Sequence, residues 1–147
     1  MRMRHIITAA ASVLLLAFSV PAQAQIPGIA CGGLRGQQAL VASLFFGRSV
    51  PGRAAVTAKE WQDFLARTVT PRFPDGLTVI DGNGQWVGRQ GRRIVHEQTK
   101  IVVISVDRST GDVSAILTKL DAIEAAYEQR FHQQKVGLVL TEGCASF

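Results

Sequence analysis

Apolar residues recur along this chain with two periods, one typical of helices and one typical of strands. Helical spacing, with apolar side chains three and four residues apart, first occurs at residues 61–69. Thr57 and Glu60 just before it form the pattern of a capping box, and Pro71 after it cannot continue a helical hydrogen-bond ladder. The sequence therefore predicts a first helix between Thr57 and Pro71.

The same spacing predicts a second, longer helix at residues 113–131, capped by Ser109 or Asp112. Extended segments are expected where short apolar runs are bounded by turn residues. Four such runs occur, at residues 39–46, 77–80, 94–106 and 136–140. The third run is apolar on both alternating faces at residues 101–104, which predicts a central strand covered on both sides.

The second of these runs is followed at once by a strong turn signal, Asp81-Gly82-Asn83-Gly84, and then by residues 85–87. Two interpretations are open for this stretch. It is either a small hairpin or a single strand interrupted by a bulge. Either one leaves the order of the main elements unchanged.

Strand, helix, strand, strand, helix, strand is the order of a ferredoxin-like α+β two-layer sandwich, βαββαβ. That fold has an antiparallel sheet with two helices on one face, and its last strand lies beside its first. Cys31 precedes the first strand and Cys144 follows the last, so the topology brings these cysteines together. A redox-active thiol normally has a close partner, as in C-x-x-C, and the sequence has none. We therefore expect a structural disulfide.

The first 24 residues have the pattern of a secretory signal peptide. Arg2 and Arg4 precede an apolar run at residues 6–20, and the small residues Ala22 and Ala24 fit a signal peptidase site. The sequence predicts cleavage after Ala24 and a periplasmic or secreted protein. Export would place both cysteines where disulfides persist.

Two alternatives to a cleaved leader are a membrane anchor that stays attached and a lipid anchor on Cys31. A membrane-spanning helix needs roughly 20 residues, and the apolar run is shorter than that. A lipid anchor on Cys31 would normally follow a Leu three residues earlier, and Gly28 stands there. We expect residues 1–24 to be a leader, residues 25–38 a flexible lead-in and residues 39–147 a single domain.

The charge balance argues against one class of partner. The chain has 16 Lys and Arg against 11 Asp and Glu, and removal of residues 1–24 leaves a net charge of +3. Such a mild excess aids solubility but is poor evidence for nucleic-acid binding by an exported protein. Arg89, Arg92 and Arg93 lie among glycines, and a solvated turn explains them more simply than an anion site does.

Motifs for cofactors and for common catalytic centres are absent from the sequence. His96 and Glu97 begin like the zinc-protease motif H-E-x-x-H, but Lys100 stands where the second His belongs. Glycines at residues 32–36 lack the Gly-Lys-Ser/Thr ending of a phosphate-binding loop. There is no G-x-S-x-G nucleophile elbow. We expect no cofactor, no metal and no catalytic residue.

A few polar and aromatic residues near strand ends or within apolar strands remain as candidates for a binding site. They are Arg48, Arg72, Asp75, Trp86, Glu97 and Lys100. A partly buried Arg beside Glu97 could bind a small anion or transfer protons. The simpler interpretation is an ion-pair and hydrogen-bond network that holds the turn at residues 73–76 against the sheet. Trp86 lies beside a glycine-rich turn, where packing and ligand contact are both open.

Several blocks of residues together resemble a known bacterial family. The blocks are Phe46-Gly47-Arg48, Glu60 to Leu65, Val69 to Val79, Gly84-Gln85-Trp86 and Tyr127 to Phe131. They resemble the domain of unknown function 3574, over about residues 40–147, and the block T-P-R-F-P-x-G-L-T-V is the most specific. The family consists largely of small exported proteins or lipoproteins, so the resemblance implies export. It implies no activity, substrate or catalytic residue.

Three functional hypotheses follow from these patterns. The first is an exported binding or interaction module for a small ligand or a protein, which forms a homodimer through the sheet face that its helices leave uncovered. The alternative is a small enzyme with a polar pocket around Glu97 and Arg48 or Arg72. A third is a structural envelope protein held by its disulfide and a partner. None involves nucleic acid or a membrane span after cleavage.

Overall fold

The computed structural model describes residues 31, 36–87, 91, 93–108 and 112–146. The predicted leader at residues 1–24 lies outside the described residues, as do most of the lead-in, Arg89, Arg92 and Ser109. Among the described residues, no helix has the length and apolar character needed to cross a membrane.

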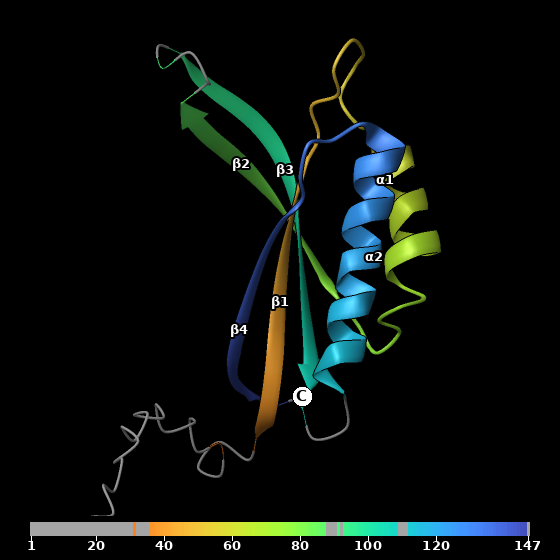
Figure 1. The fold of residues 1–147 in the computed structure, drawn as a ribbon, viewed down its shortest axis with the longest axis vertical. Helices are drawn as coiled ribbons and strands as arrows, with labels where there is room; N and C mark the ends of the chain where they lie inside the picture. Colours follow the sequence, from red (N-terminus) through yellow and green to blue (C-terminus); the bar gives the residue numbers. More distant parts are fainter. Residues whose placement is uncertain (1–30, 32–35, 88–90, 92, 109–111, 147) are drawn as a thin grey trace, which may run out of the picture.

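Four strands form one sheet, and two helical segments pack on one of its faces (Figure 1). The elements in chain order are β1 (Gln37–Gly47), α1 (Ala58–Phe64), a π-helical extension (Leu65–Val69), β2 (Thr78–Val87), β3 (Ile94–Asp107), α2 (Val113–Phe131) and β4 (Gly137–Ala145). The strand order is β2-β3-β1-β4 and every neighbouring pair is antiparallel. This arrangement confirms the predicted ferredoxin-like α+β sandwich.

Strand β2 differs from both interpretations of its glycine-rich segment. The strand runs from Thr78 to Val87 with an unbroken register against β3, in which Gly82 lies opposite Thr99 and Gly84 opposite Glu97. A Cβ at Gly82 would lie 3.1 Å from the Ile101 side chain, so the missing side chain makes room for a neighbour on β3. Cross-strand pairing therefore overrides the local turn preference, and the predictions of a hairpin or a bulge are wrong.

The strands also extend beyond the apolar runs from which they are predicted. β4 reaches Ala145, and its register places Cys144 opposite Gln38 at the start of β1. Cys31 forms the expected disulfide with Cys144, with 5.4 Å between the two Cα atoms. The bond ties the segment before β1 to the end of the edge strand β4.

Five aromatic rings fill the space between the sheet and the helices. Phe46 on β1 contacts Trp61, Phe64 and Tyr127, with ring centroids 5.3, 5.8 and 4.8 Å away. Phe131 on α2 completes the cluster, 4.7 Å from Tyr127. All five side chains are buried, and the edge-to-face geometry that most of these ring pairs adopt favours aromatic contacts.

Tyr127 is a polar member of this core. Its hydroxyl donates a hydrogen bond of 2.8 Å to the carbonyl oxygen of Gly47, at the end of β1. Burial raises the pKa of the Tyr127 hydroxyl above its ordinary value, with the nearby Glu97 carboxylate as the next cause. The hydroxyl therefore stays protonated and links α2 to the end of β1.

The first helix begins as the sequence predicts. The backbone N–H and the hydroxyl of Thr57 both donate to Glu60 Oε2, at 2.8 and 2.9 Å, and Glu60 N–H donates back to the Thr57 hydroxyl. Arg53 forms an ion pair of 3.1 Å with the same carboxylate. These donors, the Thr57 backbone N–H first, lower the pKa of Glu60 from 4.5 to about 2.

The capping box makes stability depend on pH. A carboxylate whose pKa falls on folding contributes stability above its unfolded pKa and loses that contribution as pH falls through the folded value. We expect Glu60→Gln to lower the melting temperature at pH 6, and the gap to wild type to close between about pH 4.5 and pH 2. Melting curves over this range measure the effect, and a gap that does not vary with pH contradicts it. Asp121→Asn, an exposed change on α2, is the control.

Candidate functional site

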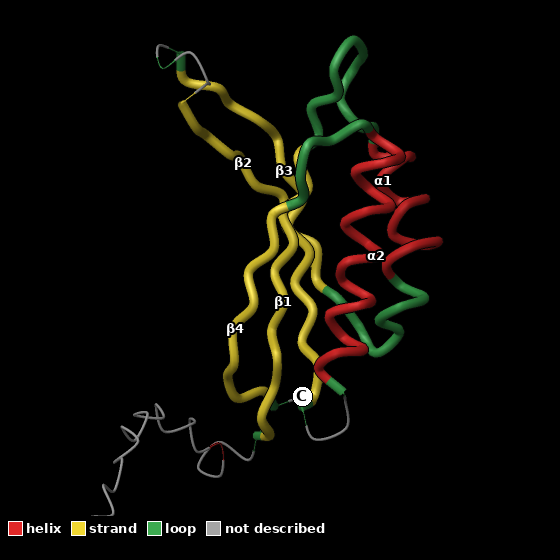
Figure 2. Tube along the Cα trace, in the orientation of Figure 1, coloured by secondary structure: helices red, strands yellow, loops and turns green. Residues whose placement is uncertain are grey.

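The register assigns the side chains of the sheet to two faces, because successive residues of a strand point in opposite directions. Leu44 and Phe46 of β1 and Val102 and Ile104 of β3 are buried under the helices. The residues between them point to the other face, which no described element covers (Figure 2). The prediction that β3 is covered on both sides is therefore wrong.

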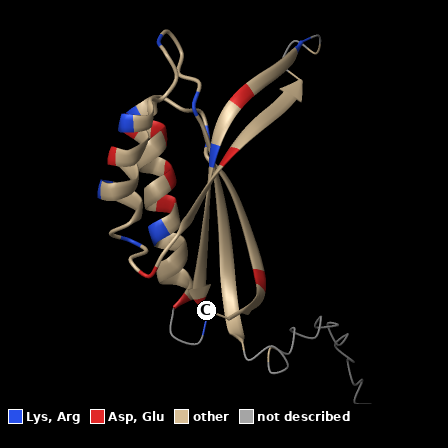
Figure 3. Ribbon diagram, turned by 180° about the vertical axis from the view of Figure 1, so that it is seen from behind, with Lys and Arg blue, Asp and Glu red and all other residues tan. Residues whose placement is uncertain are grey.

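The central part of the uncovered face carries no charge and combines apolar with hydroxyl side chains. Three of its residues are large and exposed: Phe45 by 38%, Ile80 by 48% and Val139 by 51%. The other residues of its central part are Val41, Ser43, Thr78, Thr99, Ile101, Val103, Ser105 and Thr141. Its charged residues, Glu97 and Asp107, lie at the two ends of β3. Figure 3 shows more charged residues on the helices and loops than on the sheet.

Strands β2 and β3 continue beyond the four-stranded sheet as an arm. β1 pairs with β3 only as far as Gly47 and Thr99, whereas β2 pairs with β3 up to Val87 and Ile94. Figures 1 and 2 show this part projecting away from the helices. Trp86 lies on the arm, is 47% exposed and faces the same side as the uncovered sheet face.

Arg48 is bound to the backbone of the loop between β1 and α1. Its Nε and Nη2 donate to the carbonyl oxygen of Val56 at 2.8 and 2.6 Å, and its Nη1 donates to Gln98 Oε1 at 3.1 Å. Val56 is fully buried. The guanidinium therefore holds this loop against the sheet.

Glu97 lies near the same end of β1 as Arg48 but bonds to a different group. Its Oε1 accepts a hydrogen bond of 2.9 Å from the backbone N–H of Ser49. A Cβ at Gly47 would lie 2.7 Å from both carboxylate oxygens, so the glycine makes room for the carboxylate. Glu97 thus caps the end of β1 and, among the described arginines, pairs with none.

Lys100 forms a cross-strand ion pair with Asp81, its register partner on β2. The Lys100 side chain is only 16% exposed whereas that of Asp81 is 79% exposed. The pair lies on the helix-facing side of the sheet, because Lys100 alternates with Ile101. The ion pair joins β2 to β3 where the arm leaves the four-stranded sheet.

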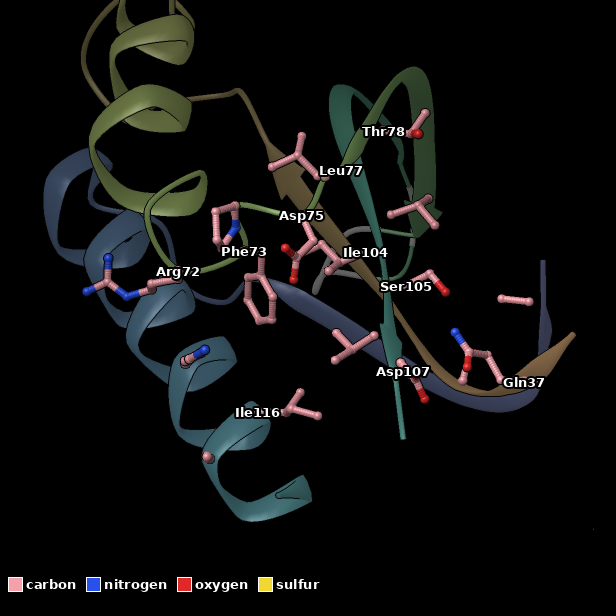
Figure 4. A pocket seen from close by; sticks show the side chains of 18 of the residues that line it. Gln37, Arg72, Phe73, Asp75, Leu77, Thr78, Ile104, Ser105, Asp107 and Ile116 are labelled. Carbon is pink, nitrogen blue, oxygen red and sulfur yellow. The ribbon is translucent and has the colours of Figure 1, made fainter. Parts of the chain in front are cut away.

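Arg72 and Asp75 lie at the other end of β3, in the loop between α1 and β2. They line a groove of about 990 Å³ together with the end of β3 and the start of α2 (Figure 4). Arg72 Nη1 donates to the carbonyl oxygen of Thr68 at 2.7 Å, and Figure 4 shows its guanidinium pointing away from β3. Asp75 is exposed, and Figure 4 shows it between Phe73 and Ile104.

The structure thus separates the six candidate residues. Arg48, Glu97 and Lys100 lie near the base of the arm, Trp86 lies on the arm, and Arg72 and Asp75 line the groove. Among the described residues, Glu97 and Arg48 are not part of the groove that Arg72 lines. Sequence reasoning missed the groove residues Phe73, Leu77, Ser105 and Ile116, because nothing in the pattern shows that β3 extends past the start of β2.

Metal ligands do not gather in the part of the chain that the structure describes. No group of three or more His, Cys, Asp or Glu side chains lies close enough to hold a metal ion there.

Two further charged residues line the groove beside Arg72 and Asp75. Asp112 caps α2, where its Oδ1 accepts a hydrogen bond of 2.9 Å from Ser114 N–H. Lys119 Nζ lies 5.7 Å above the ring of Phe73. The groove is lined by apolar, acidic and basic groups.

Solved structures with the same fold include an enzyme from a phage. The phage SAM lyase in complex with S-methyl-5'-thioadenosine is 16% identical, with a TM-score of 0.56, and the match covers 75% of this chain and 92% of that one. The lyase in its apo state is 17% identical, with a TM-score of 0.52, covering 76% and 92%. At these identities the likeness shows the fold alone.

A third solved structure is only distantly similar, and the family match is more informative. An amidase of the hydantoinase/carbamoylase family from Burkholderia multivorans is 12% identical, with a TM-score of 0.32, covering 79% of this chain and 31% of that one. No curated protein matches the chain. The model of a protein family of unknown function, DUF3574, matches residues 41–147, which span nearly the whole α+β sandwich. The chain therefore belongs to the DUF3574 family.

Proposed function

We propose that this protein is an exported interaction module that forms a homodimer through the uncovered face of its sheet. The observation that carries the proposal is the exposure of Phe45, Ile80 and Val139 on a face whose central part carries no charge. Monomeric proteins rarely expose a continuous apolar patch of this kind, and such patches mark interaction sites.

The face has the size of an ordinary interface. Three strands contribute nine paired residues each and β2 contributes five, so spacings of about 4.8 Å between strands and about 3.4 Å between residues give a flat area of roughly 520 Å². The accessible area is larger because side chains stand up from the sheet. A stable interface buries about 800 Å² on each partner, so the sheet face and the adjacent arm together are sufficient.

A second copy of the chain is the occupant that fits this chemistry. The central part of the face offers no charge with which to select a charged partner. A two-fold axis through it would place the same apolar rows against each other, and such an interface is self-complementary. Two sheets packed face to face lie about 10 Å apart, which side chains such as Phe45 and Ile101 fill.

Export is the second part of the proposal. The disulfide between Cys31 and Cys144 fits an oxidising compartment. Cleavage after Ala24 would release a chain with a short lead-in, residues 25–38, and one domain, residues 39–147. The protein would then act in the periplasm or outside the cell, with Cys31 in its disulfide rather than on a lipid.

Catalysis is not part of the proposal. Arg48 and Glu97 are bonded to backbone groups, and Arg72 lies at the opposite end of β3. The fold shared with the phage lyase supports no particular chemistry, because chemistry resides in side chains and not in the fold.

Charged substitutions on the exposed part of the face test the proposal. Ile80→Lys on β2 and Val139→Lys on β4 lie near opposite edges of the sheet, and both side chains are about half exposed, so neither change disturbs the core. We expect each to reduce the mass in light scattering from two chains to one, because dimerisation would bury an unpaired ammonium group.

Leu117→Lys is the matched control for these variants. Leu117 is an exposed leucine on α2, 37% exposed, and lies on the helical layer away from the sheet face. It should keep the mass of wild type. Equal masses for wild type, Ile80→Lys and Val139→Lys would contradict the proposed interface.

A further inference from the structure

We propose that the end of the arm is a membrane-binding site, which inserts into the interface of a bilayer that contains anionic lipids. The site consists of two cross-strand pairs, Trp86 with Val95 and Val87 with Ile94, and of Arg93 beside them. It lies where the arm projects furthest from the helices (Figures 1 and 2). Such a contact holds a protein at the membrane surface without a spanning segment.

The apolar side chains of the arm gather at its end. Trp86, Val87 and Ile94 are exposed by 47%, 63% and 54%. The next three pairs toward the sheet hold only glycine or polar residues: Gln85 with His96, Gly84 with Glu97, and Asn83 with Gln98. Transfer of exposed apolar surface out of water is favourable, so a polar arm with an apolar end favours insertion of that end alone.

The end of the arm is apolar on both faces. Residues opposite each other in an antiparallel pair point to the same face, and successive pairs alternate. Trp86 and Val95 therefore point to the side of the uncovered sheet face, whereas Val87 and Ile94 point to the opposite side. A second copy packed on the uncovered face would cover the first pair only. A bilayer that receives the end of the arm surrounds both pairs.

The length of the apolar end matches the depth of an interfacial contact. Two successive pairs extend about 7 Å, at about 3.4 Å per residue. Surface-bound segments bury their apolar side chains about 5 to 10 Å deep, at the boundary between headgroups and acyl chains. Tryptophan is enriched at this level, because its ring is apolar while its N–H can bond to water or headgroups. Trp86 is the tryptophan that the arm presents there.

The charge of the arm complements anionic headgroups. Arg93 is exposed and directly precedes Ile94, and the ion pairs between described residues do not include it. The sequence from residue 82 to residue 96 has three arginines and neither Asp nor Glu; two of them, Arg89 and Arg92, lie outside the described residues. Arginine near an anionic bilayer strengthens binding, and this attraction weakens as salt rises.

Vesicles provide the first test. The disulfide-bonded protein should sediment with vesicles of equal parts phosphatidylglycerol and phosphatidylcholine, and about tenfold or more weakly with phosphatidylcholine alone. Trp61 is 1% exposed, so Trp86 is the tryptophan whose surroundings can change, and its emission should shift to the blue on binding. Absence of binding, equal binding to both vesicles, or binding without the shift overturns the proposal.

One substitution at the end of the arm tests the position of the contact. Val87→Asp should weaken binding to the anionic vesicles about tenfold or more, because insertion would bury a carboxylate that the headgroups repel. Val87 points away from the proposed dimer face, so the change leaves that interface intact. Leu117→Asp is the matched control, since it makes the same change of charge at an exposed leucine on α2. Equal losses in both variants overturn the proposal.

A second pair of variants tests the contribution of charge. Arg93→Gln should weaken binding to the anionic vesicles about fivefold, whereas Lys59→Gln, at an exposed position on α1, should not. Equal effects overturn the predicted role of Arg93. Ile80→Lys, a monomer under the proposed function, should keep the emission shift. Failure of the dimer therefore shows in the mass in solution, and failure of the membrane contact shows in the binding to vesicles.

Discussion

Replacing Cys144 with serine is expected to lower the free energy of unfolding by about 4 to 5 kcal/mol, the largest effect that we expect of any single change. The disulfide joins residues separated by 113 positions, and cross-linking so long a loop removes much of the entropy of the unfolded chain. Urea unfolding under non-reducing conditions measures the loss. The bond also holds the segment before β1 against the edge strand β4.

The double variant provides an internal control. Cys31→Ser, Cys144→Ser and the two together each remove the same bond, so all three should lose a similar free energy. A double variant that loses about twice as much as either single would show that the cysteines contribute independently, by packing. That result, or a loss below about 1 kcal/mol, would contradict the proposed role of the disulfide.

Phe46→Ala should lower the free energy of unfolding by about 3 to 5 kcal/mol. Phe46 is fully buried, and its ring contacts those of Trp61, Phe64 and Tyr127. Truncation would leave a cavity between β1 and both helices that these rings cannot fill by small movements. Denaturant unfolding of the purified variant measures the loss.

The adjacent residue is the matched control. Phe45 belongs to the same strand but points to the uncovered face and is 38% exposed. In the Ile80→Lys background, where the proposed dimer is absent, Phe45→Ala should lose less than about 1 kcal/mol. Similar losses at positions 45 and 46 would contradict the assignment of the two faces.

The architecture could be predicted because local signals and topology agree. The capping box of Thr57 and Glu60, the helical spacing in α2 and the order of the elements all indicate one fold. The pairing of Cys31 with Cys144 follows from that fold, since its last strand lies beside its first. These features depend on neighbours in sequence or on a connectivity that few folds share.

Other features depend on pairing between distant segments, which hydrophobic patterns do not show. Gly82 and Gly84 have the sequence of a turn, but β3 holds them in an extended strand. The apolar alternation of β3 indicates two covered faces, yet one helical layer covers only one of them. β4 continues past its apolar run, because its pairing with β1 extends to Ala145.

The candidate site was only partly predictable for the same reason. The pattern places Arg48 and Glu97 near strand ends, but the structure bonds Arg48 to Val56 O and Glu97 to Ser49 N. Arg72 and Asp75 do line a groove. The groove itself exists because β3 is longer than β2 at that end, which is a property of register.

The mass of the wild-type protein in solution tests the proposed interface most directly. Sedimentation equilibrium of the disulfide-bonded protein, over a series of concentrations, reports whether the apolar face of the sheet is covered by a second copy. The proposal predicts the mass of two chains, which dissociates on dilution to one. A mass of one chain up to the highest soluble concentration would contradict it.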